Sequence, residues 1–436
     1  MRILSNELIE YIGQQVTVSG WLHKKREMGN LTFLVIRDRQ GLIQVVDDTS
    51  EESSKLKGLQ NGTIISVTGL VKAEPRASNG AEIHDPKVTV DVPINEVSPI
   101  EVDKNISHNP DNYDTLFGYR YLTLRNLKER AIFRVQDGVS RGARDFFHKN
   151  DFTEFHSPKL LAGATEGGSE VFTLDYFGQT ASLAQSAQFY KQMMVGVFER
   201  VFEIGATYRA EPSFTTRHMT EFTTIDMELG FVESVQDVWD MTNNLLNSIS
   251  DYIWSHYEAD LTLLGATKPL LPAKYPQITV DNLHALYFEK TQKDLRGEKD
   301  PSPEEERWIC DYSAKNWKSD AVFVTEFPSS EKAFYHMVNS DKPEVTLRAD
   351  LLFRGVEIAT VPLREHRYDI LLEQIKAKGL DPESEGFKYY VAAFKHGMPM
   401  HGGFGMGFER LVQKFIGLAS VKEATLFPRD VNHLAP

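Results

Sequence analysis

Apolar and polar residues alternate along the first hundred residues of the chain. The alternation falls in five short segments, separated by Gly, Asn and Asp: QVTVSGWLHKKR, NLTFLVIRD, LIQVVDD, TIISVTGLVKA and KVTVDVPINEV. A period of two residues is typical of strands that bury one face, and the residues between the segments favour tight turns. The first part of the chain is therefore predicted to be a small barrel of five strands.

A five-stranded Greek-key barrel of this size is typical of the OB fold. The basic run 24–26 precedes a turn at Gly29, and Phe33 follows on the next predicted strand, with Gln44 on the third. A basic edge beside an exposed aromatic ring can hold single-stranded nucleic acid, because the ring stacks on a base and the cations neutralise its backbone. A solvated charged hairpin with Phe33 in the core is the other interpretation, and the pattern leaves both open.

The pattern changes after residue 98. The stretch 98–114 is polar and rich in Asn and Asp, which predicts a hinge. Apolar residues at helical spacing then predict a long amphipathic helix at 129–152. Short strands and helices follow without βαβ alternation, which favours an α+β domain with a mostly antiparallel sheet and, at 265–345, a helical excursion from it. We expect three parts: a barrel domain at 1–104, a hinge at 105–128 and the second domain at 129–436.

One predicted strand of the second domain ends in an unexpected residue. The run GVEIATVP is apolar and β-branched, as a buried strand requires, yet Arg364 follows directly after Leu363. A charged side chain in apolar surroundings is costly unless another group pairs with it. The strand pattern alone therefore does not explain why an arginine occupies this position.

Two pairs of charged residues flank a predicted turn between strands. Arg209 and Glu211 are two residues apart and share one face of a strand, while Arg217 and His218 follow the intervening loop. An arginine placed there can clamp a phosphate bidentately, and the neighbouring loop cation can hold another. A structural ion pair between Arg209 and Glu211 is the alternative.

Two carboxylates, Asp350 and Glu357, lie in another apolar stretch. Buried carboxylates are costly unless a cation pairs with them, and a divalent metal bound to nucleotide phosphates uses one or two. Their separation of seven residues would put them on opposite faces of a regular strand, and Gly355 offers a turn or bulge that reconciles them. The glycine-rich run HGGFGMG is expected to be a loop where backbone approaches a ligand, and it leads into a helix with Arg410 in its first turn. It lacks the Walker lysine and the spacing of a dinucleotide fingerprint.

Composition narrows the class of protein. A net charge of −14 argues against a protein that coats nucleic acid nonspecifically. The single cysteine, Cys310, excludes an intramolecular disulfide and fits a reducing compartment. No apolar run approaches the roughly 18–20 residues of a membrane span. We expect a cytoplasmic protein without membrane attachment.

The order of these features resembles the three signature motifs of the class II aminoacyl-tRNA synthetases. The matching residues are Pro158, Phe202, Arg209 and Glu211, the pair Asp350 and Glu357, and Gly405, Gly407, Glu409 and Arg410. The resemblance covers most of the chain and is closest to the aspartyl-tRNA synthetases of archaeal type, in the aspartate, asparagine and lysine subgroup. It implies an ATP-dependent ligase with an N-terminal OB anticodon-binding domain and a catalytic domain whose central antiparallel sheet is flanked by helices. It also implies a homodimer, because Pro158 stands where the family has an interface proline.

The resemblance implies which residues bind the amino acid. They are Glu166 in ATEGGSEVF, Ser186, Gln188 and Lys191 in QSAQFYK, Asp226 in FTTIDME, and Arg364. Lys191 and Arg364 would meet the side-chain carboxylate of L-aspartate, and two cations would reject the neutral amide of asparagine. The family writes the turn before this arginine as SGGQR, whereas this chain has TVPLR. The replacement of two glycines leaves open a paralogue with another amino acid, or with a non-tRNA acceptor as in asparagine synthetases of this lineage.

The resemblance also implies the cofactors ATP and Mg²⁺. The expected ATP-binding residues are Arg209, Glu211, Arg217, His218, Glu357 and Arg410, of which Arg209, Glu211 and Arg410 are expected to be catalytic, and the expected metal ligands are Asp350 and Glu357. In the barrel, Arg26, Phe33 and Gln44 stand where the family reads the central uracil of the anticodon of tRNA(Asp). His23, with Pro75 nearby, favours enzymes that also charge tRNA(Asn).

Overall fold

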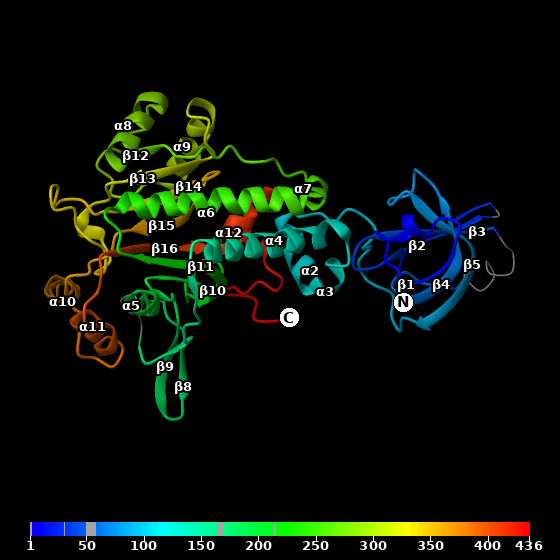
Figure 1. Ribbon diagram of the computed structural model, residues 1–436, viewed down its shortest axis with the longest axis horizontal. Helices are drawn as coiled ribbons and strands as arrows, with labels where there is room; N and C mark the ends of the chain where they lie inside the picture. Colours follow the sequence, from blue (N-terminus) through cyan, green and yellow to red (C-terminus); the bar gives the residue numbers. More distant parts are fainter. Residues whose placement is uncertain (1, 30, 49–57, 164–169, 213–214) are drawn as a thin grey trace. The chain divides into compact units, whose positions relative to one another are not determined.

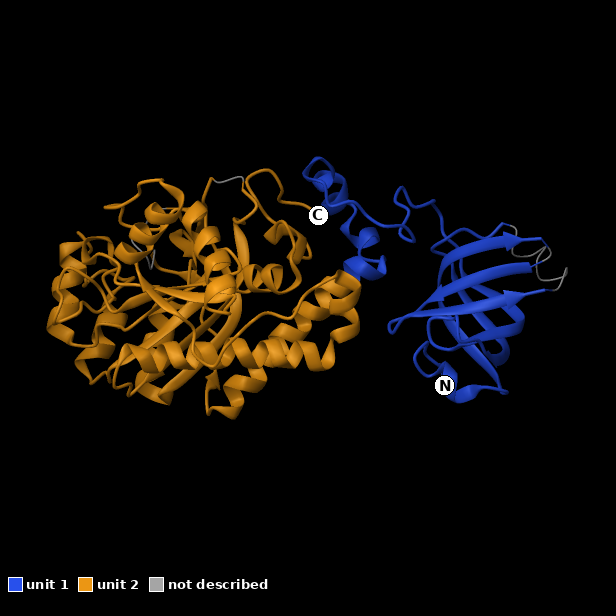
Figure 2. Ribbon diagram, turned by 90° about the horizontal axis from the view of Figure 1, so that it is seen from above, with its two compact units in different colours: residues 1–130 blue, residues 131–436 orange. Residues whose placement is uncertain are grey.

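The computed structural model describes residues 2–29, 31–48, 58–163, 170–212 and 215–436. The chain divides into two compact units, residues 1–130 and residues 131–436 (Figure 2). The first contains the predicted barrel and hinge, and the second contains the predicted α+β domain. No helix in the described ranges is long and apolar enough to cross a membrane.

The first unit is built on a closed barrel with the strand order β1-β2-β3-β5-β4 (Figure 1). Its strands are β1 (Gln15–Met28), β2 (Leu31–Arg37), β3 (Leu42–Asp47), β4 (Ile64–Ala73) and β5 (Ala81–Val92). Every second residue points inward, so that Val18, Val67 and Ile83 are fully buried in one cluster. The predicted barrel is confirmed, and it follows from the period-two pattern of the sequence.

Gly20 allows β1 to close the barrel. At this point the strand pairs with β4 through Ile65, and at Trp21 it begins to pair with β2 as well. A Cβ atom at Gly20 would lie 2.5 Å from the carbonyl oxygen of Arg37, so only glycine fits without a shift of β2.

Short helices precede and follow the barrel strands along the chain. They are η1 (Leu8–Tyr11), η2 (Pro110–Asn112), α2 (Tyr113–Gly118) and α3 (Arg120–Thr123). Arg120 is fully buried and lies 3.4 Å from Glu129, which occupies the first turn of α4 (Leu127–Lys149). The predicted hinge therefore contains short helices, and Arg120 within it packs against the start of α4.

The second unit contains an eight-stranded sheet with the order β12-β13-β14-β15-β16-β11-β10-β6. The strands are β6 (Thr153–Glu154), β10 (Arg200–Tyr208), β11 (Glu221–Gly230), β12 (Gln277–Thr279), β13 (Ala321–Thr325), β14 (Arg348–Phe353), β15 (Val356–Pro362) and β16 (His401–Gly407). The six central strands are antiparallel, and the two edge strands β12 and β6 pair in parallel. A small separate sheet contains β7 (Leu160–Leu161), β9 (Gln179–Leu183) and β8 (Thr173–Tyr176).

Helices cover both faces of the large sheet. The remaining elements are α5 (Gln188–Phe198), α6 (Val235–His256), α7 (Glu258–Leu264), α8 (Val280–Thr291), α9 (Pro303–Asn316), η3 (Ser329–Glu331), α10 (Tyr368–Ala377), α11 (Lys388–Lys395), α12 (Phe408–Ile416) and η4 (Val421–Ala424). Helices α4 and α6 share the main core with Phe323 of β13, whereas α8 and α9 pack on its neighbours Val322 and Val324 from the other face. The helical excursion predicted at 265–345 is present as α8 and α9, but β12 and β13 of the same stretch belong to the sheet.

Candidate active site

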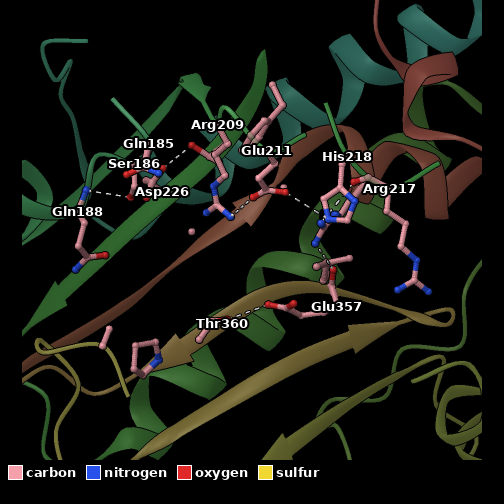
Figure 3. Close-up of a pocket in the computed structure, with 18 of the residues that line it drawn as sticks. Gln185, Ser186, Gln188, Arg209, Glu211, Arg217, His218, Asp226, Glu357 and Thr360 are labelled. Atoms are coloured by element: carbon pink, nitrogen blue, oxygen red, sulfur yellow. Dashed lines mark hydrogen bonds and ion pairs between the residues drawn. The ribbon is translucent and has the colours of Figure 1, made fainter. Parts of the chain in front are cut away.

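A cavity of about 530 Å³ opens on one face of the large sheet, within the size range of small-molecule sites. Strand β11 shows how the sequence builds its wall. Asp226 and Glu228 point to the cavity side, while the alternate residues Ile225, Met227 and Leu229 belong to the hydrophobic core on the other side. Residues from the connection between β10 and β11, from β15, β16 and α5, and from the start of α12 complete the wall (Figure 3).

Four buried charges form the floor at the α5 end of the cavity. Lys191 Nζ donates hydrogen bonds to Asp226 Oδ1 (2.8 Å) and to the carbonyl oxygen of Phe404 (2.7 Å), and it lies 3.7 Å from Glu228 Oε2. Arg364 Nε donates to Glu228 Oε1 over 2.9 Å. All four charged side chains are at most 3% exposed. We call Lys191, Asp226, Glu228 and Arg364 the buried charge cluster.

The buried charge cluster is electrically balanced, which changes the expected basis of selectivity. Each cation already has an anionic partner, so a bound amide would leave no buried positive charge unpaired, and the expectation that the two cations reject an amide for that reason is wrong. The donors still discriminate: Lys191 uses two of its three N–H groups, and Arg364 Nη1 has no hydrogen bond within the described ranges. Both oxygens of a carboxylate can accept from these groups, whereas an amide has one acceptor oxygen.

Gln188 is held by a buried chain of hydrogen bonds. Its Nε2 donates to Gln192 Oε1 (2.8 Å), and Gln192 Nε2 lies 2.9 Å from His401 Nε2. Because His401 Nδ1 faces the carbonyl oxygen of Pro399 at 2.8 Å, Nδ1 carries the proton and Nε2 accepts. Burial lowers the pKa of His401 to about 4, so the imidazole is neutral. Ser186, also at the cavity, accepts from the backbone N–H of Gln188 at the start of α5.

Glu211 lies between Arg209 and His218, just beyond the end of β10. Arg209 Nη1 is 3.6 Å from Glu211 Oε1, and His218 Nε2 is 3.7 Å from Glu211 Oε2 (Figure 3). Arg209 is partly exposed at the cavity, where an ion pair of this length contributes little to stability. Burial, together with the surrounding arginines, lowers the pKa of His218. The geometry leaves Arg209 able to turn toward an anion in the cavity.

Arg217 and Arg410 lie together at the same end. Arg217 Nη1 donates to Glu306 Oε2 of α9 (2.9 Å), a partner that the sequence did not suggest. Arg410 Nη1 donates to the carbonyl oxygen of Glu357 (3.2 Å), which fixes the first turn of α12 against β15. Burial raises the pKa of Glu306, and Arg217 opposes that shift. The two arginines and Arg209 make this end of the cavity suited to phosphates.

Asp350 and Glu357 are brought to one face by a tight turn. Arg354 and Gly355 both have positive φ, at 45° and 85°, and connect β14 to β15 in a hairpin. Glu357 pairs with Leu352, two residues from Asp350, so that both carboxylates point to the same side. The expectation that Gly355 reconciles their spacing is confirmed.

The two carboxylates fit a divalent cation that also binds phosphate. Burial and the nearby Glu357 raise the pKa of Asp350. Arg348 opposes this shift, because its Nη2 donates to Asp350 Oδ2 over 2.8 Å. Glu357 lines the cavity, and Thr360 Oγ1 donates to its Oε1 (2.9 Å). Within the described ranges no group of three or more His, Cys, Asp and Glu could hold a metal ion, so a cation here would need phosphate or water oxygens as further ligands.

The glycine-rich run is a strand, so the prediction of a loop is wrong. β16 lies between β15 and β11 in the middle of the sheet. A Cβ atom at Gly403 would lie 2.0 Å from the carbonyl oxygen of Met227, and one at Gly405 would lie 3.4 Å from Asp226 Oδ1. The glycines therefore permit close packing of strands and keep the cavity floor open.

Arg364 remains at the cavity although Val361 and Pro362 precede it. Val361 is fully buried in the core, and its carbonyl oxygen accepts from Trp239 Nε1 (3.0 Å). Pro362 lines the cavity as the last residue of β15, where a missing N–H is tolerated. Neither residue has positive φ. The strand conformation therefore does not require glycine at these positions.

Comparison with known proteins agrees with this arrangement. The family described as tRNA synthetases class II (D, K and N) matches residues 112–431, which is more than half of the chain. The chain belongs to this family. The family described as OB-fold nucleic acid binding domain matches residues 16–91 of the barrel.

Relatives of this synthetase match over the full length. An aspartate–tRNA(Asp/Asn) ligase of Thermus thermophilus is 41% identical over 436 residues, with 100% of both chains covered. An aspartate–tRNA(Asp) ligase of Pyrococcus horikoshii is 40% identical, with 99% of both covered. The crystal structure of asparaginyl-tRNA synthetase from Pyrococcus horikoshii complexed with asparaginyl-adenylate has a TM-score of 0.91 at 30% identity, with 100% of both covered.

The barrel of the synthetase gathers the three residues expected to contact nucleic acid. Arg26 lies opposite Phe33 in the β1–β2 pair, and Gln44 lies two residues from Val46, the partner of Phe33 on β3. All three therefore share the outer face, while Leu34, between them in register, is fully buried. Phe33 is partly exposed, so the interpretation that it belongs to the core is wrong. Gln44 Nε2 donates to Glu82 Oε2 over 2.7 Å.

Several residues at the cavity escaped sequence analysis. Tyr335, His336 and Thr360 line the cavity, and Glu228 and Glu306 pair with its arginines Arg364 and Arg217. Glu228 could have been found, because it lies two residues from Asp226 on one strand. Glu306, Tyr335 and His336 come from a region without a recognisable pattern. Glu166, the residue expected at the amino group of the substrate, lies outside the described residues.

Proposed function

We propose that this synthetase is an aspartate–tRNA ligase, which activates L-aspartate with ATP and transfers it to the 3′ end of tRNA(Asp). The observation that carries the proposal is the buried charge cluster, because it offers N–H donors of Lys191 and Arg364 to a side-chain carboxylate at the cavity. Full-length relatives at about 40% identity with aspartate–tRNA ligase names support the same substrate.

The proposed activation needs positioning and charge stabilisation rather than a protein nucleophile. An oxygen of the substrate's α-carboxylate attacks the α-phosphorus of ATP, the bond from that phosphorus to the bridging oxygen breaks, and pyrophosphate leaves. Arg209 would stabilise the charge that develops on the α-phosphate. Arg217, His218 and Arg410 would hold the β and γ phosphates, and Glu211 would orient Arg209 and His218.

The carboxylates of Glu357 and Asp350 would hold Mg²⁺ together with phosphate and water oxygens. When bound, it would neutralise phosphate charge during pyrophosphate release. Thr360 orients Glu357 through its hydrogen bond, and Arg348 orients Asp350. In the second half-reaction, the terminal ribose hydroxyl of the tRNA attacks the aspartyl carbonyl and AMP leaves.

The barrel is proposed to bind the anticodon, with Phe33 stacking on a base beside Arg26 and Gln44. His23, which lies on β1, and the Thermus thermophilus relative's name favour an enzyme that charges tRNA(Asn) as well. Pro158 is exposed, as a role at a homodimer interface requires. We expect the enzyme to act in the cytoplasm. A non-tRNA acceptor is disfavoured because the barrel is present.

Amino-acid-dependent exchange of pyrophosphate into ATP, followed by charging of the two tRNAs, tests the proposal. We expect exchange with L-aspartate, weak or no exchange with L-asparagine, and charging of tRNA(Asp). Exchange with L-aspartate but no charging of either tRNA would refute the tRNA acceptor. Replacing Val361 and Pro362 by glycine should change the rate of aspartate activation by no more than about threefold. A large rise in that rate would mean that the pocket of this chain is no longer adapted to aspartate.

A further inference from the structure

His336 is a buried cavity residue that the proposed mechanism does not use. It is only 6% exposed and lines the cavity on the side of the buried charge cluster. Nδ1 has no hydrogen-bond partner among the described residues, and no side-chain hydrogen bond of Nε2 occurs in the same ranges. A buried nitrogen without a partner is unfavourable, so this imidazole is unlike an ordinary core histidine such as His401.

The backbone fixes His336 beside Arg364. The two residues form an antiparallel bridge, and the hydrogen bonds around them run from Met337 N to the oxygen of Leu363 and from Glu365 N to the oxygen of Tyr335. His336 and Arg364 are therefore a non-hydrogen-bonded pair, the arrangement in which directly opposed side chains come closest and share one face. Whatever anion Arg364 meets at the cavity is within reach of the imidazole.

The surroundings determine the charge of His336 and the ligand it suits. The charged groups that act on it are cationic: Arg364 from the strand partner, Arg348 from β14, Lys332 from its own segment and Lys191 from α5. Burial and these cations keep the pKa of His336 well below its ordinary value, so the ring is neutral and offers one N–H donor. A neutral donor among cations suits an anionic ligand.

We propose that His336 is a specificity-determining residue whose Nε2–H donates to the side-chain carboxylate of the bound amino acid, alongside Lys191 and Arg364. This inference rests on the proposed aspartate activity. It assigns a third donor to the carboxylate, from a segment between β13 and β14. Since Nδ1 is enclosed, Nε2 is the nitrogen that can face the substrate.

Three variants of the full chain test the proposal through the KM values for aspartate and ATP in pyrophosphate exchange. His336→Phe keeps the ring and removes both nitrogens; the KM for aspartate should rise roughly 10- to 100-fold while the KM for ATP stays within about twofold. His336→Gln places an N–H near the position of Nε2 and should retain most of the affinity. His336→Asn places it near Nδ1 and should behave like His336→Phe.

His366→Phe is the matched control. His366 also has an Nδ1 without a partner among the described residues but does not line the cavity, so the KM for aspartate should not change. An unchanged KM in His336→Phe, or equal losses in the Gln and Asn variants, would overturn the inference. If His336→Phe does not fold, the comparison of Gln with Asn decides. A wild-type enzyme without aspartate-dependent exchange would instead overturn the proposed function, and the inference with it.

Discussion

Lys191 and Asp226 allow the folding role of a buried ion pair to be separated from its proposed role in substrate binding. Their side chains are 1% and 2% exposed and lie 2.8 Å apart. Replacing Lys191 by Met keeps an unbranched side chain and removes the charge. Asp226 would then remain buried with the Thr224 hydroxyl as its hydrogen-bond donor. Leaving one member of a buried pair unpaired costs about 3–5 kcal/mol, so the free energy of unfolding should fall by that amount.

The double variant Lys191→Met/Asp226→Asn removes both charges together. The amide oxygen of the introduced asparagine can still accept from Thr224, and no unpaired charge is left, so the free energy of unfolding should return to within about 1 kcal/mol of wild type. The N–H donor for the substrate carboxylate is absent from both variants. Loss of a hydrogen bond between charged groups is worth up to about 3 kcal/mol, so kcat/KM for aspartate should fall roughly 100-fold in each.

Urea denaturation with linear extrapolation measures the first quantity, and aspartate-dependent pyrophosphate exchange measures the second. Stability should fall only in the single variant, which leaves Asp226 without its cation, whereas activity should fall in both variants, because both lack Lys191. A double variant that regained both stability and aspartate activation would refute the reasoning, because Lys191 would then have only a structural role.

Four further changes test other parts of the site. Glu357→Gln should lower the kcat of exchange at least roughly 100-fold with an unchanged melting temperature, since it removes a proposed metal ligand; near-normal exchange would refute that assignment. Glu306→Gln weakens the hold on Arg217 and should raise the KM for ATP roughly fivefold but not the KM for aspartate, about 1 kcal/mol for a partly exposed pair; a change in both would indicate a general distortion. The folded-state pKa of His401, about 4, lies below the unfolded value, so stability should decrease as pH falls from 6.5 toward 4, by up to roughly 3 kcal/mol. His401→Gln should reduce that loss in pH-dependent denaturation, and an identical slope would contradict the buried neutral ring. Phe33→Ala should raise the KM for tRNA roughly tenfold in charging while leaving pyrophosphate exchange unchanged, as loss of one stacked base requires; an unchanged KM would exclude the stacking role.

The fold could be predicted largely from local patterns. Period-two alternation gave the barrel strands, and helical spacing gave α4, because both are set by which residues face the core. The glycine-rich strand β16 could not be predicted as a strand, since its residues are poor strand formers. Close contact with β11 across Gly403 determines its conformation, and that contact joins residues far apart in sequence.

The candidate site was predictable only where one strand or turn carries its residues. The shared face of Asp350 and Glu357 followed from the expected turn at Gly355. Other residues could not be found in the same way, because Glu306 reaches Arg217, and His336 reaches the cavity, only through tertiary packing of separate segments.

Amino-acid-dependent pyrophosphate exchange by the wild-type enzyme, with L-aspartate and L-asparagine compared at equal concentration, tests the central claim most directly. The donors of Lys191 and Arg364 at the cavity predict robust exchange with L-aspartate and at least roughly 100-fold lower kcat/KM with L-asparagine, because both oxygens of a carboxylate can accept from these donors whereas an amide has one acceptor oxygen. Equal exchange with the two amino acids, or exchange with L-asparagine alone, would contradict the account.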